Sequence, residues 1–137
     1  MKPKILLIAL AAANLFSPST QAAVLYWGGG TVNIAANCDG ISQGESGTWD
    51  TGISNWDAGS GLAHVSWAKR YGAVSGGTGG TVTLGGALTT LCLTFNVDGY
   101  IITGTSILTI KSGGIVANGN TTFNAPLKLG TAQSWIC

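Results

Sequence analysis

The chain has 137 residues, which is a usual size for a single domain. Charged residues make up only 8% of it and the formal net charge is +1, so the sequence lacks the basic stripe of a nucleic-acid-binding protein. The 22 glycines, abundant Thr and Ser, and a single Glu disfavour helices and favour short strands joined by tight turns.

Residues 1–22 have the layout of a secretory signal peptide. Lys2 and Lys4 give a positive start, Ile5–Phe16 is almost entirely apolar, and small residues lead up to Ala22. The apolar run is shorter than the about 20 residues that a membrane-spanning helix needs. We therefore predict export, with cleavage after Ala22 or, as the second choice, after Ala23. The mature chain then meets an oxidising compartment.

Residues 23–72 form a first zone that is rich in tryptophan and acidic residues. The zone holds four of the five tryptophans and four of the five acidic residues, and no regular alternation runs through it. We therefore predict an irregular β region here. Its tryptophans are Trp27, Trp49, Trp56 and Trp67.

Residues 73–137 contain little charge and a series of short alternations of apolar and polar residues. In Leu91–Val97, apolar side chains fall on every second residue, which is the pattern of a half-buried strand. Glycine pairs, Asp98-Gly99 and Asn118-Gly119 separate the alternating runs as turns. The predicted strands are Thr81–Leu84, Leu91–Val97, Tyr100–Thr103, Ser106–Ile110, Gly114–Ala117 and Thr121–Leu129.

Two all-β architectures fit this rhythm. The Asp-Gly and Asn-Gly turns suit hairpins in an antiparallel β-sandwich. Alternatively, each turn is the corner of a coil and strands of successive coils stack in parallel. Leu93 and Phe95 match Leu108 and Ile110 about 15 residues on, which suggests such a coil. Outward rows of Thr and Asn favour the stacked coil, because like residues then form ladders.

A series of short motifs follows in a defined order. The pieces are Gly47–Thr51, Ser54–Asp57, Gly76–Leu84, LCLTFNVDGYIIT at Leu91–Thr103, and Ser106–Ile110. In this order, over roughly Thr48 to Trp135, they resemble the autotransporter-associated β-strand repeat proteins. The Leu91–Thr103 stretch is similar to that family's recurrent unit of an LTF strand, an acidic-Gly turn and a YTI-type strand.

The resemblance implies an all-β fold, a right-handed single-stranded parallel β-helix with a tryptophan-rich N-terminal cap over residues 23–72. The β-helix repeats would occupy residues 73–137 as about three coils. The resemblance also implies a structural or display role at the cell surface or outer membrane, where an outer-membrane barrel often follows such a passenger.

The chain departs from the family at Cys92, where a small residue is usual, and in Arg70–Ser75. It also stops at Cys137, within a stretch that resembles a strand. We therefore expect a truncated N-terminal fragment, whose open C-terminal coil favours self-association.

Trp49, Asp50, Trp56 and Asp57 are the candidate site residues. Exposed indole faces stack on sugars, whereas buried ones would cap the end of a β-helix, which is the reading we favour. The two aspartates suit a paired acid site or a calcium cluster, but calcium takes six or more oxygen ligands. Each aspartate also suits an Asx turn, and we expect that role instead.

We predict neither a metal nor a cofactor. His64 is the only histidine, so we expect a structural residue rather than a zinc ligand or a base for Ser66. The glycine-rich strings lack the Lys-Ser/Thr of a phosphate-binding loop. Cys38 and Cys92 are the candidate disulfide of an exported protein, which leaves Cys137 over.

These observations predict a secreted or cell-surface structural module without catalysis. The alternative is a glycan-binding adhesin. A β-helix polysaccharide lyase or hydrolase is disfavoured, because residues 73–137 carry few carboxylates, lysines and arginines. The expected partners are a cell-surface glycan or a second copy at the open coil, and not nucleic acid.

Overall fold

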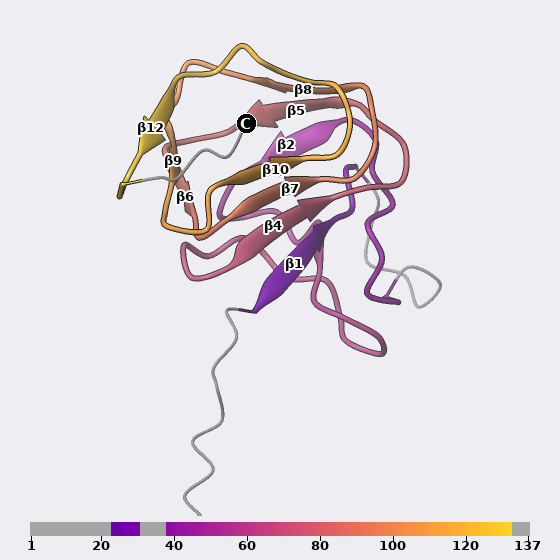
Figure 1. Ribbon diagram of the computed structural model, residues 1–137. Coiled ribbons are helices and arrows are strands. Elements are labelled where there is room, and N and C mark those ends of the chain that lie inside the picture. The colour runs from indigo at the N-terminus through magenta and orange to yellow at the C-terminus, as the bar shows by residue number, and fades with distance from the viewer. Residues whose placement is uncertain (1–22, 31–37, 133–137) are drawn as a thin grey trace, which may run out of the picture.

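The computed structural model describes residues 23–30 and 38–132 and shows an all-β structure (Figure 1). The predicted signal peptide and Cys137 lie outside the described residues. Within the described ranges, no helix is long and apolar enough to cross a membrane. The strands are β1 (Val24–Trp27), β2 (Gly47–Trp49), β3 (Trp56–Asp57), β4 (Gly72–Ser75), β5 (Thr81–Leu84), β6 (Leu88–Thr90), β7 (Leu93–Phe95), β8 (Tyr100–Thr103), β9 (Leu108–Ile110), β10 (Ile115–Ala117), β11 (Thr121–Phe123) and β12 (Leu127–Leu129).

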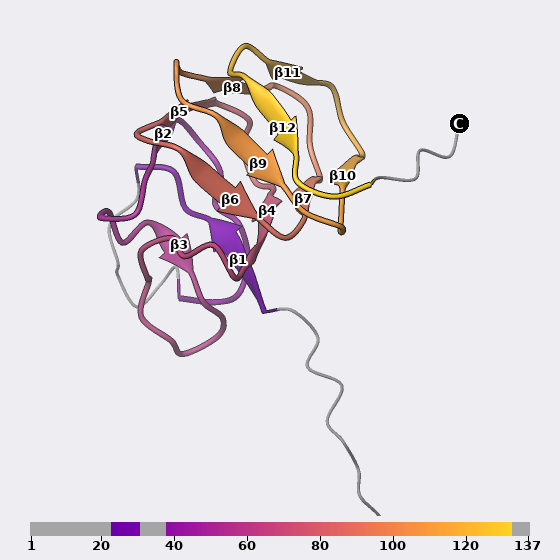
Figure 2. The same ribbon diagram turned by 90° about the vertical axis from the view of Figure 1, so that its left-hand side faces the viewer.

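Successive strands from β4 onward visit three sheets in turn, as Figures 1 and 2 show from two sides. The sheets have the orders β10-β7-β4-β1-β3, β11-β8-β5-β2 and β12-β9-β6. Each strand from β4 to β9 pairs in parallel with the strand three places later, so three consecutive strands make one circuit of the chain. The antiparallel sandwich is therefore wrong, because consecutive strands turn a corner into another sheet instead of folding back as hairpins.

One circuit is longer than the spacing that the sequence suggested. Leu88 of β6 pairs with Leu108 of β9, 20 residues on, and Leu93 of β7 pairs with Ile115 of β10, 22 residues on. Leu93 and Leu108 match at 15 residues, but they lie on different sheets of the same circuit. The same alternation of apolar and polar residues occurs in all three strands of a circuit. Two similar stretches of sequence can therefore lie on different sheets and need not stack on each other.

The predicted strands Thr81–Leu84 and Tyr100–Thr103 coincide with β5 and β8. Thr121–Leu129 is instead two strands, because the chain turns a corner at Asn124, whose N–H donates to the carbonyl oxygen of Ile102. The predictions miss β4 and β6, because polar Ser75 and Thr90 occupy buried positions there and hide the alternation of apolar and polar residues.

The core lies between the three sheets and is lined by alternate side chains of the strands. In β5, for example, Val82 is buried while the threonines on either side of it are exposed. Like residues stack on the outside: Thr89 pairs with Thr109, and the Asn118 amide donates to the Asn96 side-chain oxygen at 3.1 Å. These are the ladders expected of stacked strands.

The strands β1 and β2 extend two of these sheets. β1 pairs in parallel with β4, and β2 pairs in parallel with β5. Two of the sheets and the buried core therefore extend into residues 23–72. This zone, which was predicted to be irregular, contains regular strands. β3 comes from a loop in this zone and pairs antiparallel with the outer edge of β1, which it covers.

Candidate functional site

The four tryptophans of residues 23–72 form one buried cluster. Trp27, Trp49, Trp56 and Trp67 are 0–3% exposed, and neighbouring rings in the cluster have centroids 4.5–5.0 Å apart. β1, β2 and β3 each contribute one ring, so the pairing of the first strands brings them together. Stacking on a sugar needs an exposed ring face. Contrary to the glycan-contact alternative, Trp49 and Trp56 offer none, because both are core residues.

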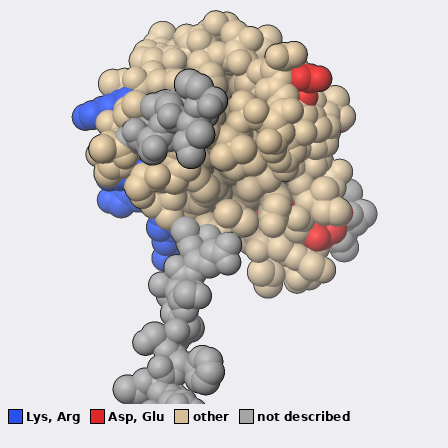
Figure 3. Space-filling model, viewed as in Figure 1, with Lys and Arg blue, Asp and Glu red and all other residues tan. Residues whose placement is uncertain are grey.

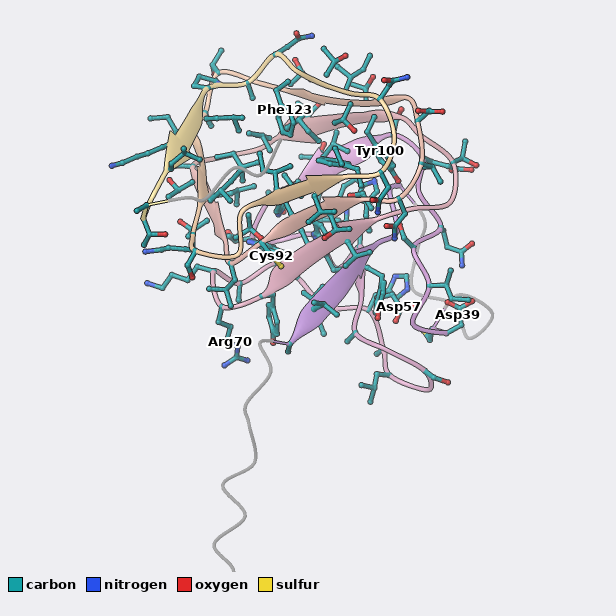
Figure 4. The ribbon with its side chains drawn as sticks, viewed as in Figure 1. Asp39, Asp57, Arg70, Cys92, Tyr100 and Phe123 are labelled. Carbon is teal, nitrogen blue, oxygen red and sulfur yellow. The ribbon has the colours of Figure 1, made fainter. Side chains whose placement is uncertain are left out.

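Asp57 holds two loops together. Its side chain is 1% exposed, and its carboxylate accepts N–H groups from Asp39 at 3.1 Å, Gly40 at 2.7 Å and Gly59 at 2.7 Å. Burial acts to raise the pKa of Asp57, but the three backbone donors and the nearby His64 outweigh it, so the pKa is lowered from its usual value. Asp57 is therefore an ionised anchor for the loops beside β3 (Figure 4).

Asp50 has a local role in a different turn. It follows β2, and its Oδ1 accepts N–H groups from Gly52 at 2.8 Å and Ile53 at 2.7 Å, which is the geometry of an Asx turn. Among the residues that the structure describes, no group of three or more His, Cys, Asp or Glu side chains is placed to hold a metal ion. Asp50 thus serves backbone N–H groups of its own turn, whereas Asp57 serves those of its own loop and of the loop at Asp39 and Gly40.

The structure does not join Cys38 to Cys92, so the predicted disulfide is wrong. Cys92 has a free thiol, and burial raises its pKa. It precedes β7 and stacks between glycines of the neighbouring circuits: an added side-chain carbon at Gly72 or at Gly113 would come within 2.5 Å of it. Cys38 instead adjoins Asp39 beside the β3 loops, and Figure 4 shows Asp39 at the edge of the molecule and Cys92 nearer its middle.

A groove of about 210 Å³ lies on the outer face of the first sheet, near these loops. Tyr26 of β1 and Val74 of β4 pair in register and form its floor, and the segment around Ile41 forms a wall. Sequence reasoning missed this groove, because its wall comes from a loop that no alternation places. It is lined by Tyr26, Gly40, Ile41, Ser42, Val74, Gly76, Gly77, Asn96 and Val97.

Buried hydrogen bonds hold the wall of the groove against its floor. The Ser42 hydroxyl donates to the carbonyl oxygen of Trp27 at 2.7 Å and accepts the N–H of Gly76 at 2.8 Å. The Tyr100 hydroxyl donates to the carbonyl oxygen of Gly76 from the core side, and burial raises the pKa of Tyr100. The groove is therefore a fixed feature that presents one aromatic ring, aliphatic side chains and one amide.

Comparison with known proteins relates the chain to autotransporters. It is 34% identical over 99 residues to the adhesin BmaC autotransporter of Brucella suis biovar 1 (strain 1330). The match covers 67% of this chain but only 3% of the length of that relative. No family model matches the chain, and no solved structure matches it. The chain is thus similar to a short segment of a much longer autotransporter adhesin.

Proposed function

We propose that the chain is a structural display module of an autotransporter-type passenger, exported and held at the cell surface or outer membrane. The observation that carries this proposal is the repeated circuit, in which each strand from β4 to β9 pairs in parallel with the strand three places later. Such a stack grows by whole circuits and provides length and rigidity without assembling a site. The similarity to a segment of an autotransporter supports the same role.

In this proposal the stack is a right-handed parallel β-helix over residues 73–137, residues 23–72 are its N-terminal cap, and residues 1–22 are its signal peptide. Two observations support the cap. β3 lies along the outer edge of β1, and the tryptophan cluster fills the interior next to the first strands. A strand edge and an apolar interior both need such cover at the end of a solenoid.

We also propose that the module is not an enzyme. A polysaccharide lyase or hydrolase needs convergent acids and bases that a substrate can reach. The candidate carboxylates do not offer this, since Asp57 is buried and both Asp50 and Asp57 are engaged by backbone N–H groups. Release of sugars from a pectin-like polysaccharide by the purified protein would overturn this part of the proposal.

Display on intact Gram-negative cells tests the main proposal. The chain, with its own residues 1–22, is joined to an outer-membrane barrel and carries an epitope inserted at Gly61, an exposed turn residue. We expect antibody to label intact cells. Leu7→Arg puts a charge into the apolar run of the signal peptide and should abolish labelling, whereas Leu7→Ile should not. Retention of the unchanged chain in the cytoplasm would contradict export.

A second candidate function is a glycan-binding adhesin that uses the outer groove. Tyr26 and Asn96 place an aromatic ring and an amide in that groove, which is a combination that suits a sugar. The relative of this chain is named an adhesin. Binding on a glycan array that is lost in Tyr26→Ala but kept in Thr109→Ala, an outward residue of another sheet, would favour this function. Absence of binding to every glycan on the array would contradict the adhesin function, and only the display role would then remain.

A further inference from the structure

The basic residues of the described chain gather on one side of the molecule. In the view of Figure 3, the blue Lys and Arg atoms lie along one edge and the red acidic atoms lie on the other side. Beyond residue 22 the chain has four basic and five acidic residues, a net charge of −1, so this segregation is local. The basic residues are Lys69, Arg70, Lys111 and Lys128.

Hydrogen bonds between circuits place Arg70 and Lys111 at a single corner of the stack, which we call, together with the neighbouring Lys128, the basic corner. The N–H of Leu91 donates to the carbonyl oxygen of Tyr71 at 2.9 Å, next to Arg70. One strand layer on, the N–H of Lys111 donates to the carbonyl oxygen of Thr90 at 3.0 Å. The chain thus returns to the same corner, between the third and first sheets, once in every circuit.

Lys128 lies beside this corner, on the third sheet, where it stands in register with Thr109, two residues before Lys111. Lys128 lies in β12, which pairs with β9, and its side chain is exposed. Two residues later, an added side-chain carbon at Gly130 would lie 3.3 Å from Cδ of Lys111. Because stacked strands lie about 4.8 Å apart, Arg70 and Lys111 occupy corners about 10 Å apart along the stack. The charges of Arg70 and Lys111 therefore follow the stacking direction, and Lys128 stands beside them on the next strand layer.

One end of the row is held in place by an aromatic ring. The guanidinium carbon of Arg70 lies 5.1 Å from the centre of the Tyr71 ring, and its Nη2 donates to the Tyr71 hydroxyl at 3.0 Å. Figure 4 shows Arg70 at the edge of the molecule. A guanidinium fixed in this way presents a planar fork of donors that matches carboxylate or sulfate oxygens.

We propose that the basic corner binds a linear acidic polysaccharide through its carboxylate or sulfate groups. A row of separate cations along one corner fits a linear polyanion, whereas a membrane surface calls for a cluster of about four to eight basic residues facing one plane. The net charge of −1 provides no general attraction to an anion, so binding depends on this corner. The biological setting rests on the proposed export, because such polymers are met outside the cell.

Binding to heparin, a linear chain with both sulfate and carboxylate groups, tests the inference in solution. We expect binding that weakens at least about tenfold between 50 and 200 mM NaCl, because a few ion contacts are screened. The triple substitution Arg70→Gln, Lys111→Gln and Lys128→Gln should abolish it. The control Glu45→Gln with Asp98→Asn changes net charge at turns away from the corner and should leave the affinity unchanged within about threefold.

Three results would overturn the inference: no heparin binding by the unchanged protein, equal binding by the triple variant, or binding to phosphatidylserine vesicles without binding to heparin. Circular dichroism of each variant establishes that a loss of binding is not a loss of fold. A protein that reaches the cell surface but does not bind heparin would remove this inference and leave the display role standing.

Discussion

Leu129 lies in register with Ile110 on the neighbouring strand, yet Ile110 is fully buried and Leu129 is 47% exposed. Both residues occupy the same inward position of the circuit. They differ in what lies beyond them: β9 is covered by β12, and β12 is the last strand of its sheet among the described residues. Burial of an inward side chain in this stack is therefore decided by the next circuit and not by the residue itself.

This relationship predicts unequal costs for equivalent truncations. Ile110→Ala should lower the free energy of unfolding by about 2–5 kcal/mol, since it leaves a cavity in the closed core. Leu129→Ala should cost less than about 1 kcal/mol, since solvent already reaches the site. Urea unfolding followed by tryptophan fluorescence measures both. Equal losses would mean that the last circuit is covered as fully as the one before it.

The carboxylate of Asp57 predicts a dependence of stability on pH. Its pKa is lower in the folded state than in the unfolded chain, so the ionised form stabilises the fold at every pH above the unfolded value of about 3.9. That contribution is lost as the pH falls through the folded pKa. At pH 7, Asp57→Asn should cost about 1–3 kcal/mol, because the replaced oxygen leaves a backbone donor unpaired.

The stability difference between Asp57→Asn and the unchanged protein should shrink in acid, where Asp57 is itself protonated. Asp50→Asn is the matched control, since the Asp50 turn is at the surface, and it should cost less. Urea unfolding at several pH values measures these differences. A pH-independent difference for Asp57→Asn would contradict the proposed anchoring by charge.

Gly79 tests the contact between successive circuits at the corner that joins the first and second sheets. An added side-chain carbon there would lie 2.3 Å from the carbonyl oxygen of Asp98 in the next circuit, a backbone atom that cannot move aside cheaply. Gly79→Ala should therefore cost about 1–3 kcal/mol or more. Gly86→Ala, at a turn glycine with nothing within 4 Å, should be neutral or slightly stabilising. Thermal unfolding compares the two, and a harmless Gly79→Ala would contradict this stacking.

The tryptophan cluster predicts that Trp56 supports the fold from inside. Trp56→Ala should lower the free energy of unfolding by about 3–5 kcal/mol, because the ring is fully buried between Trp27, Trp49 and Trp67. Leu62→Ala, at a side chain that is 55% exposed, is the control and should change little. In a Trp135→Phe variant, which leaves only the cluster tryptophans, iodide should also quench the native fluorescence poorly. Strong quenching by iodide in that variant would show that the cluster rings are open to solvent.

The residues themselves identified much of the local structure. The alternation in Thr81–Leu84 and Tyr100–Thr103 determines a strand and the face it buries, because successive side chains point to opposite sides. Asp50 predicted its own Asx turn, since that turn closes within three residues. These features depend on neighbours in the chain, and the sequence contains them directly.

Other features were decided only when the circuits stacked. An alternation with a period of two residues specifies which face of a strand is buried, but not which strand pairs with it. It therefore left parallel and antiparallel pairing open, and it matched Leu93 with Leu108, whereas Leu93 pairs with Ile115. It also could not show that Cys38 and Cys92 are not joined, that Trp56 is buried, or that Ile41 lies beside Tyr26 in a groove. Each of these depends on contacts between residues of different strands and loops, which only the paired sheets and the loops packed on them bring together.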